Sequence, residues 1–138
     1  MNESKFKFNN PVLEHLEFGI NDKFEEEKYH GIEINGETQI TRVKNKEKAL
    51  VKLCLYIGEQ TDAAPFWIKV SMRAKFVWEK NMKPELVERL LQANAPSLLL
   101  SYIRPIVSNI TSNTQFPTFN IPFMDMQDNL AIIEDGEI

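Results

Sequence analysis

The chain has 138 residues, of which 43% are hydrophobic and 26% are charged, and its formal net charge is −4. This length and composition predict one globular domain that buries a core without disulfide or metal staples. The negative charge argues against nucleic acid as the main partner, because phosphate binding favours a basic surface.

The first half of the chain alternates apolar and polar residues, which is the pattern of β-strands. Most even positions from Phe6 to Ile20 are apolar, and we predict a first strand there. Pro11 lacks a backbone donor, so this strand should lie at a sheet edge or contain a bulge. A charged connection over residues 21–28 follows, in which Phe24 is the one large apolar side chain. Residues 31–43 and 49–57 are then predicted as two further strands.

The fourth predicted strand, residues 66–78, is the clearest element. Its even positions are all apolar, whereas Lys69, Arg73 and Lys75 lie between them. This pattern predicts a strand of an antiparallel sheet with one face in the core and one face in water.

From Pro84 onward the apolar spacing becomes helical. We expect Asn94 and Pro96 to interrupt the helix, and Pro105 to kink a second helical run over residues 98–110. The sequence therefore predicts an α+β fold, a four-stranded antiparallel sheet followed by a long kinked helix packed on one face. Residues 1–126 are predicted to form a single domain, and residues 127–138 an acidic C-terminal tail.

Residues that could carry chemistry are sparse. His15 and His30 are the only histidines, and neither has a companion at metal-ligand spacing. Cys54 lies in the apolar run of residues 50–57, which favours a packed thiol over a nucleophile. The chain has no glycine-rich phosphate loop. We therefore expect no enzymatic activity, no metal and no cofactor.

The expected compartment follows from three features of the chain. A single cysteine excludes an internal disulfide, which suits a reducing environment. The N-terminal residues lack the apolar core of a signal peptide, and no apolar run is long enough to cross a bilayer. We therefore expect a cytoplasmic protein that does not insert into a membrane.

The basic row of the fourth strand leaves an alternative open. Lys69, Arg73 and Lys75 beside Trp67 could grip RNA by charge and stacking. The net negative charge and the lack of further aromatic residues on that face favour a solvated sheet surface instead.

The segment of residues 95–126 is the least usual part of the chain. After the helical run it continues as FPTFNIPFMDM, in which Phe and Met alternate with Pro, Asn and Asp. One interpretation is an irregular core segment, and the other is a surface that uses adaptable Phe and Met side chains to contact other chains. The predicted first strand also offers an edge to which a second copy could pair.

This segment resembles the SecB export chaperones. The family carries a proline before an apolar helix, then Tyr-x-Arg, then Phe-Pro-x-x-Asn, and a Gly-Glu loop before the last strand. The matching residues here are Pro96, Tyr102, Arg104, Phe116, Pro117, Asn120, Ile121, Ile57, Gly58 and Glu59. The resemblance covers roughly residues 4–126, and only the helix and the FPxxN part are specific.

The resemblance implies an ATP-independent holdase chaperone, not an enzyme, that forms a homotetramer as a dimer of dimers in the cytoplasm. Such proteins bind unfolded or extended polypeptides in hydrophobic grooves and pass export clients to the SecA motor. The implied peptide-binding residues of this chain are Phe24, Tyr29, Ile32, Ile34, Phe116, Phe119 and Phe123.

The positions that match the family's acidic motor-docking surface are altered in this chain. They carry His15, Gly19, Trp67 and Lys69. This difference supports an alternative, a SecB-like chaperone dedicated to one partner such as an antitoxin, without an export-motor role. A third hypothesis, an enzyme or small-molecule binder on the same fold, would require His15 or His30 to meet carboxylates in a closed pocket.

Overall fold

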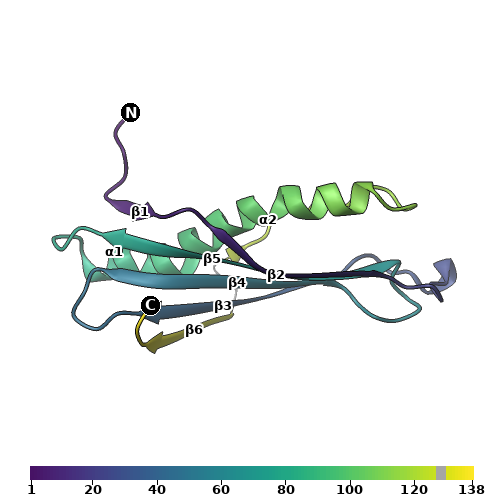
Figure 1. Ribbon diagram of the computed structural model, residues 1–138, viewed down its shortest axis with the longest axis horizontal. Helices are drawn as coiled ribbons and strands as arrows, with labels where there is room; N and C mark the ends of the chain where they lie inside the picture. Colours follow the sequence, from purple (N-terminus) through teal and green to yellow (C-terminus); the bar gives the residue numbers. More distant parts are fainter. Residues whose placement is uncertain (127–129) are drawn as a thin grey trace.

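The computed structural model describes residues 1–126 and 130–138, in which one sheet carries a helix along one of its faces (Figure 1). The strands are β1 (Phe6–Phe8), β2 (Val12–Ile20), β3 (Ile34–Arg42), β4 (Lys48–Gly58), β5 (Phe66–Trp78) and β6 (Leu130–Asp135). The order is β1-β5-β4-β3-β6, and β2 also pairs with β5, so β1 and β2 share one edge of β5. The predicted α+β class is confirmed.

The first predicted strand is in fact two strands, which partly explains why the sheet has six strands and not four. Pro11 cannot donate to the ladder, and pairing with β5 resumes at Val12. A bulge between Leu13 and His15 then shifts the register. As a result Leu13 and Leu16 both lie on the helix-facing side of the sheet, opposite core residues of β5.

The predicted acidic tail contributes the other additional strand. β6 pairs with β3 in parallel, from Leu130 opposite Glu37 to Asp135 opposite Arg42. The Gly136 N–H continues the ladder by donating to the Arg42 carbonyl at 2.9 Å. The predicted boundary after residue 126 falls at residues 127–129, which lie outside the described residues.

The core lies between the inner faces of β4 and β5 and the helix α2 (Ala95–Ser112). The predicted alternation of the fourth strand is confirmed, because its even positions from Phe66 to Phe76 are all 5% exposed or less. From α2, Leu99, Ile103 and Val107 pack on them with no exposed surface. No helix of the described residues lies over the opposite face of the sheet (Figure 1).

The predicted interruption at Asn94 and Pro96 is wrong. Helix α1 (Pro84–Arg89), a π-helical turn η2 (Leu90–Asn94) and α2 follow one another without a break. The Ala95 N–H donates to the Leu90 carbonyl five residues earlier. This wider turn accommodates Pro96, which has no N–H of its own to donate. The helix also continues through Pro105, and the kink there stays a prediction.

Gly58, at the end of β4, provides a test of this architecture. Its φ is +69°, and a Cβ placed there would lie 2.2 Å from the Phe66 carbonyl oxygen. We expect Gly58→Ala to lower the free energy of unfolding by about 1–3 kcal/mol, because both the backbone conformation and the close approach favour glycine. Urea denaturation measures the change.

Gly31 is the matched control for this substitution. Its φ is also positive, at +101°, but nothing lies within 4 Å of the position its Cβ would occupy. Gly31→Ala should therefore show the backbone cost without the clash. An equal loss in the two variants would contradict the role given to the contact with Phe66.

Candidate binding groove

An apolar groove lies where two connecting segments meet beyond the end of α2. One wall comes from the connection between β2 and β3, the other from the segment that follows α2, and β5 starts beneath them. The cavity has a volume of about 370 Å³ and is lined by Phe24, Glu26, Tyr29, Ile32, Pro65, Phe66, Phe116, Pro117, Thr118 and Phe119.

Aromatic rings form most of the lining and contact one another edge to face. The Phe24 ring is 5.8 Å from Phe116 and 6.1 Å from Tyr29, measured between centroids. The Phe119 ring is 6.2 Å from Phe66, which also belongs to the core. These T-shaped pairs leave ring faces and edges on the groove surface, where an apolar side chain of another molecule can pack.

The first wall is fixed to the loop between β4 and β5. The Asn21 side-chain amide donates to the carbonyls of Glu59 and Ala64 at 2.7 and 2.8 Å. Lys28 forms ion pairs with Asp62 at 2.6 Å and with Glu25 at 2.9 Å. Its hydrogen bonds to these carboxylates, that to Asp62 first, raise the pKa of the Lys28 ammonium above its usual value. The ammonium is therefore charged at any physiological pH.

The second wall is fixed to α2. The buried Thr111 hydroxyl donates to the Val107 carbonyl and accepts a hydrogen bond from the Phe119 N–H, both at 2.9 Å. Farther along, the Arg104 guanidinium donates to the carbonyls of Ile121 and Pro122 at 3.3 and 2.8 Å. The irregular segment after the helix is thus held by side chains in place of a backbone ladder.

The structure brings together most of the predicted peptide-binding residues. Phe24, Tyr29, Ile32, Phe116 and Phe119 all line the groove. The lining residues Pro65 and Phe66 were not predicted from the sequence. The alternation of its strand predicts that Phe66 lies in the core. Its ring contact with Phe119 shows that it also reaches the groove.

Two of the predicted peptide-binding residues do not line the groove. Ile34 begins β3 and packs against the core. Phe123 is fully exposed, and its ring lies under the Arg104 guanidinium at 5.9 Å. Its position follows from Arg104, which holds the backbone at Pro122 and turns the next side chain outward.

The four positions that match the family's motor-docking surface lie on the sheet face opposite α2. Trp67 packs over Gly19, where a Cβ would be only 2.5 Å from its Nε1. His15 Nε2 is 2.6 Å from Glu17 Oε1. Lys69 lies over the Tyr56 ring, with its Nζ 5.6 Å from the ring centroid.

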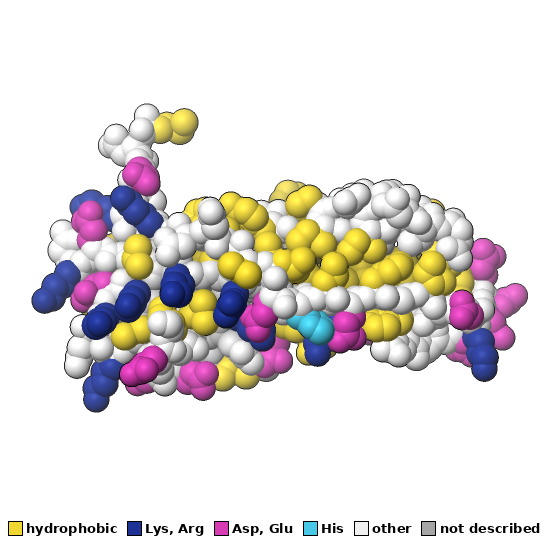
Figure 2. Space-filling model, in the orientation of Figure 1, with side chains coloured by type: hydrophobic (Ala, Val, Ile, Leu, Met, Phe, Trp, Pro, Cys, Tyr) yellow, Lys and Arg dark blue, Asp and Glu magenta, His cyan; other side chains and the backbone are white. Residues whose placement is uncertain are grey.

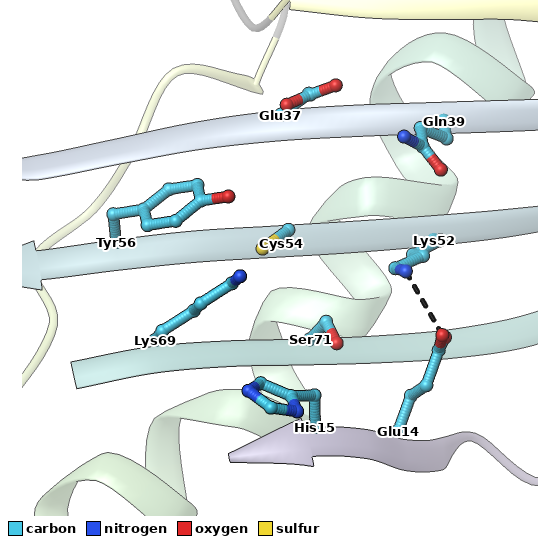
Figure 3. A pocket seen from close by; sticks show the side chains of 9 residues that line it. All are labelled: Glu14, His15, Glu37, Gln39, Lys52, Cys54, Tyr56, Lys69 and Ser71. Carbon is cyan, nitrogen blue, oxygen red and sulfur yellow. Dashed lines mark hydrogen bonds and ion pairs between the residues drawn. The ribbon is translucent and has the colours of Figure 1, made fainter. Parts of the chain in front are cut away.

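The prediction of a packed Cys54 thiol is wrong. Cys54 is only half-buried and lies on the same polar sheet face, beside Tyr56 (Figure 3). The reason is the period of the strand: Val51, Leu53 and Leu55 take the inner face, which leaves Cys54 on the outer one. Its hydrogen bond with Tyr56 raises the pKa of the Tyr56 hydroxyl, which stays a neutral donor near pH 7.

Within residues 1–126 and 130–138, no His, Cys, Asp and Glu side chains gather into a group of three or more that could hold a metal ion. In the same part of the chain, none of the helices has the length and apolar character needed to cross a membrane.

Comparison with known proteins identifies the family to which this chain belongs. The family model described as "SecB: Preprotein translocase subunit SecB" matches residues 16–129, and the chain belongs to the SecB family. It is 27% identical over 133 residues to "Uncharacterized protein MJ0357" of Methanocaldococcus jannaschii, covering 94% of this chain and 84% of that protein. It is 32% identical over 63 residues to "Protein-export protein SecB" of Anaplasma phagocytophilum, covering 43% and 40% of the two chains.

A solved structure shares the fold at low sequence identity. The SecB-like chaperone Rv1957 of Mycobacterium tuberculosis, in complex with a ChAD peptide from the Rv1956 HigA1 antitoxin, superposes with a TM-score of 0.67. The match covers 87% of this chain and 91% of that one, with 13% sequence identity. The likeness confirms the predicted SecB-like fold.

The hydroxyl of Thr111 provides a test of how the second wall is held. Thr111→Val keeps the side-chain shape but removes the acceptor for the Phe119 N–H. We expect the free energy of unfolding to fall by about 1–2 kcal/mol and the Phe119 amide to exchange faster with solvent. Thr118→Val, at an exposed position of the same segment, is the control and should change neither quantity. Unchanged exchange at Phe119 in Thr111→Val would contradict this anchoring.

Proposed function

We propose that this protein is an ATP-independent, non-enzymatic holdase that binds unfolded or extended polypeptides in the groove, in the cytoplasm. Membership of the SecB family and a fold shared with a SecB-like chaperone support a chaperone role. The observation that carries the proposal is the aromatic groove, which is open to solvent between two anchored walls.

The groove suits a segment without a fixed structure. Its rings offer large apolar surfaces at low entropic cost, and an extended client can insert one side chain after another between them. A protein that binds the unfolded state withdraws it from aggregation, because the apolar segments that would associate are covered. This requires neither nucleotide nor a catalytic residue.

We further propose that the protein assembles as a homotetramer, a dimer of dimers. Hydrophobic side chains form a band between α2 and the edge strand β2 (Figure 2). Leu13 and Leu16 on β2 and Tyr102 on α2 are 38–43% exposed in the single chain. Apolar surface of this kind beside an unpaired strand edge favours association with a second copy. Light scattering would show a mass four times that of the chain; a monomer at high concentration would contradict the assembly.

A second candidate is a chaperone dedicated to one unstable partner. Rv1957 was solved with a peptide from an antitoxin, which shows the kind of client that this fold can take. In addition, Lys69 stands at a position that is acidic in the motor-docking surface of the family, so we do not extend the proposal to SecA. Assays against several unrelated unfolded proteins separate the two candidates: protection of many favours the general holdase, and protection of one favours the dedicated chaperone.

Tyr29 provides the test of the groove. Tyr29→Asp puts a charge on the wall of an apolar site, at a position already 45% exposed, so the fold should tolerate it. We expect the amount of protein needed to halve the aggregation of a heat-unfolded client, without ATP, to rise about fivefold or more.

Ile132→Asp is the matched control, because Ile132 is 44% exposed and lies outside the groove, on β6 at the other edge of the sheet. It should protect the client as the unmodified protein does. Equal loss in both variants, or no protection by the unmodified protein at any ratio to client, would refute the proposal.

A further inference from the structure

The sheet face opposite α2 contains a hollow of about 310 Å³ that the groove does not involve (Figure 3). Across its floor run His15, Ser71, Cys54 and Glu37, which are successive cross-strand partners on β2, β5, β4 and β3. Their side chains therefore share one face, with neighbouring strands about 4.8 Å apart.

Ser71 lies on the floor of the hollow. Its residue surface is only 2% exposed, yet its hydroxyl has no hydrogen-bond partner in the part of the chain that the structure describes. All fully buried side-chain polar atoms of that part are paired. The Ser71 side chain lines the hollow, where its hydroxyl can donate a hydrogen bond to a ligand.

The charges around Ser71 favour an anionic group. Lys69 forms no ion pair with a described residue, and its ammonium points from β5 toward Cys54 on β4 (Figure 3). The nearby carboxylate of Glu14 is already neutralised by Lys52 at 3.0 Å and Arg73 at 3.9 Å. Of the other acids on this face, Glu17 has its Oε1 2.6 Å from His15 Nε2, and Glu37 lies on β3, beyond Cys54 as seen from Ser71. A carboxylate beside Ser71 would therefore meet a hydroxyl donor and an unpaired ammonium.

The row of donors continues along β5 with the period of an extended chain. Lys69, Ser71, Arg73 and Lys75 occupy alternate positions of the strand, all on the same face. At about 3.3 Å per residue, an extended segment lying along β5 presents a side chain to each of them in turn. Beside Arg73 and Lys75, an acidic residue of this chain, Glu137, already lines the neighbouring hollow.

Nucleic acid fits this face less well than an acidic peptide. Trp67, the aromatic residue nearest the row, is packed over Gly19, and the Tyr56 ring is covered by Lys69. Among the described residues, this face has no row of open aromatic rings of the kind on which successive bases of a single strand stack.

We propose that this face is a docking surface for an acidic, extended segment of a partner protein, with one carboxylate bound by Ser71 and Lys69. It lies on the other side of the sheet from the apolar groove, so it would hold a partner while the groove holds a client.

The test uses a nine-residue peptide of alternating Glu and Ser with blocked, labelled ends. Fluorescence anisotropy should show binding that weakens with added salt. Lys69→Met should weaken it about three- to tenfold, and Ser71→Ala about two- to tenfold. Lys83→Met, the same change at an exposed position before α1, should leave it unaffected.

Cys54 gives an independent footprint, since it is the single cysteine and lines the hollow. The bound Glu-Ser peptide should slow its alkylation by iodoacetamide, whereas an unfolded client in the groove should not. The proposal would be overturned if the Glu-Ser peptide did not bind, if Lys69→Met and Lys83→Met had equal effects, or if alkylation were unchanged. Tighter binding of a single-stranded RNA or of the matching Lys-Ser peptide would also overturn it. Aggregation assays on the same preparation measure client binding in the groove. They therefore test the holdase proposal independently of the docking surface.

Discussion

The packing of α2 on the apolar faces of β4 and β5 positions both walls of the groove. Phe66 shows the connection most directly, because it is part of the core and its ring also contacts Phe119 at the groove. Thr111, in the last turn of α2, is buried by the same packing and holds the wall to which Phe119 belongs. The groove is thus an extension of the core beyond the end of the helix.

The features that could be predicted from the sequence depend on local patterns. Apolar and polar residues alternate along residues 66–78, and the apolar side chains are buried at every second position from Phe66 to Phe76, as the period of a strand predicts. Phe24 stands alone as a large apolar residue in a charged connection, so it had to pack against something, and Phe116 is its partner. The FPTF sequence identified the opposite wall because its prolines exclude a continued helix while its rings require burial.

The features that were missed depend on contacts distant in sequence. Nothing local to Leu130–Asp135 shows that this acidic segment pairs with β3 in parallel. The face on which Cys54 lies was misjudged because its neighbours in the chain are apolar, although the strand period places them on the other side. Phe123 has the composition of a groove residue, and only the hydrogen bonds of Arg104 explain why it points away from the groove.

The period of β5 separates two kinds of constraint along one strand. Phe66, Ile68 and Val70 pack in the core, whereas Lys69 and Arg73 face water or whatever docks there. Substitutions at the exposed odd positions can therefore accumulate without disturbing the packing of the core. A lineage could replace one docking partner by another through point mutations on this strand and keep its client groove intact, whereas a single inserted residue within β5 would exchange the two faces and destroy both.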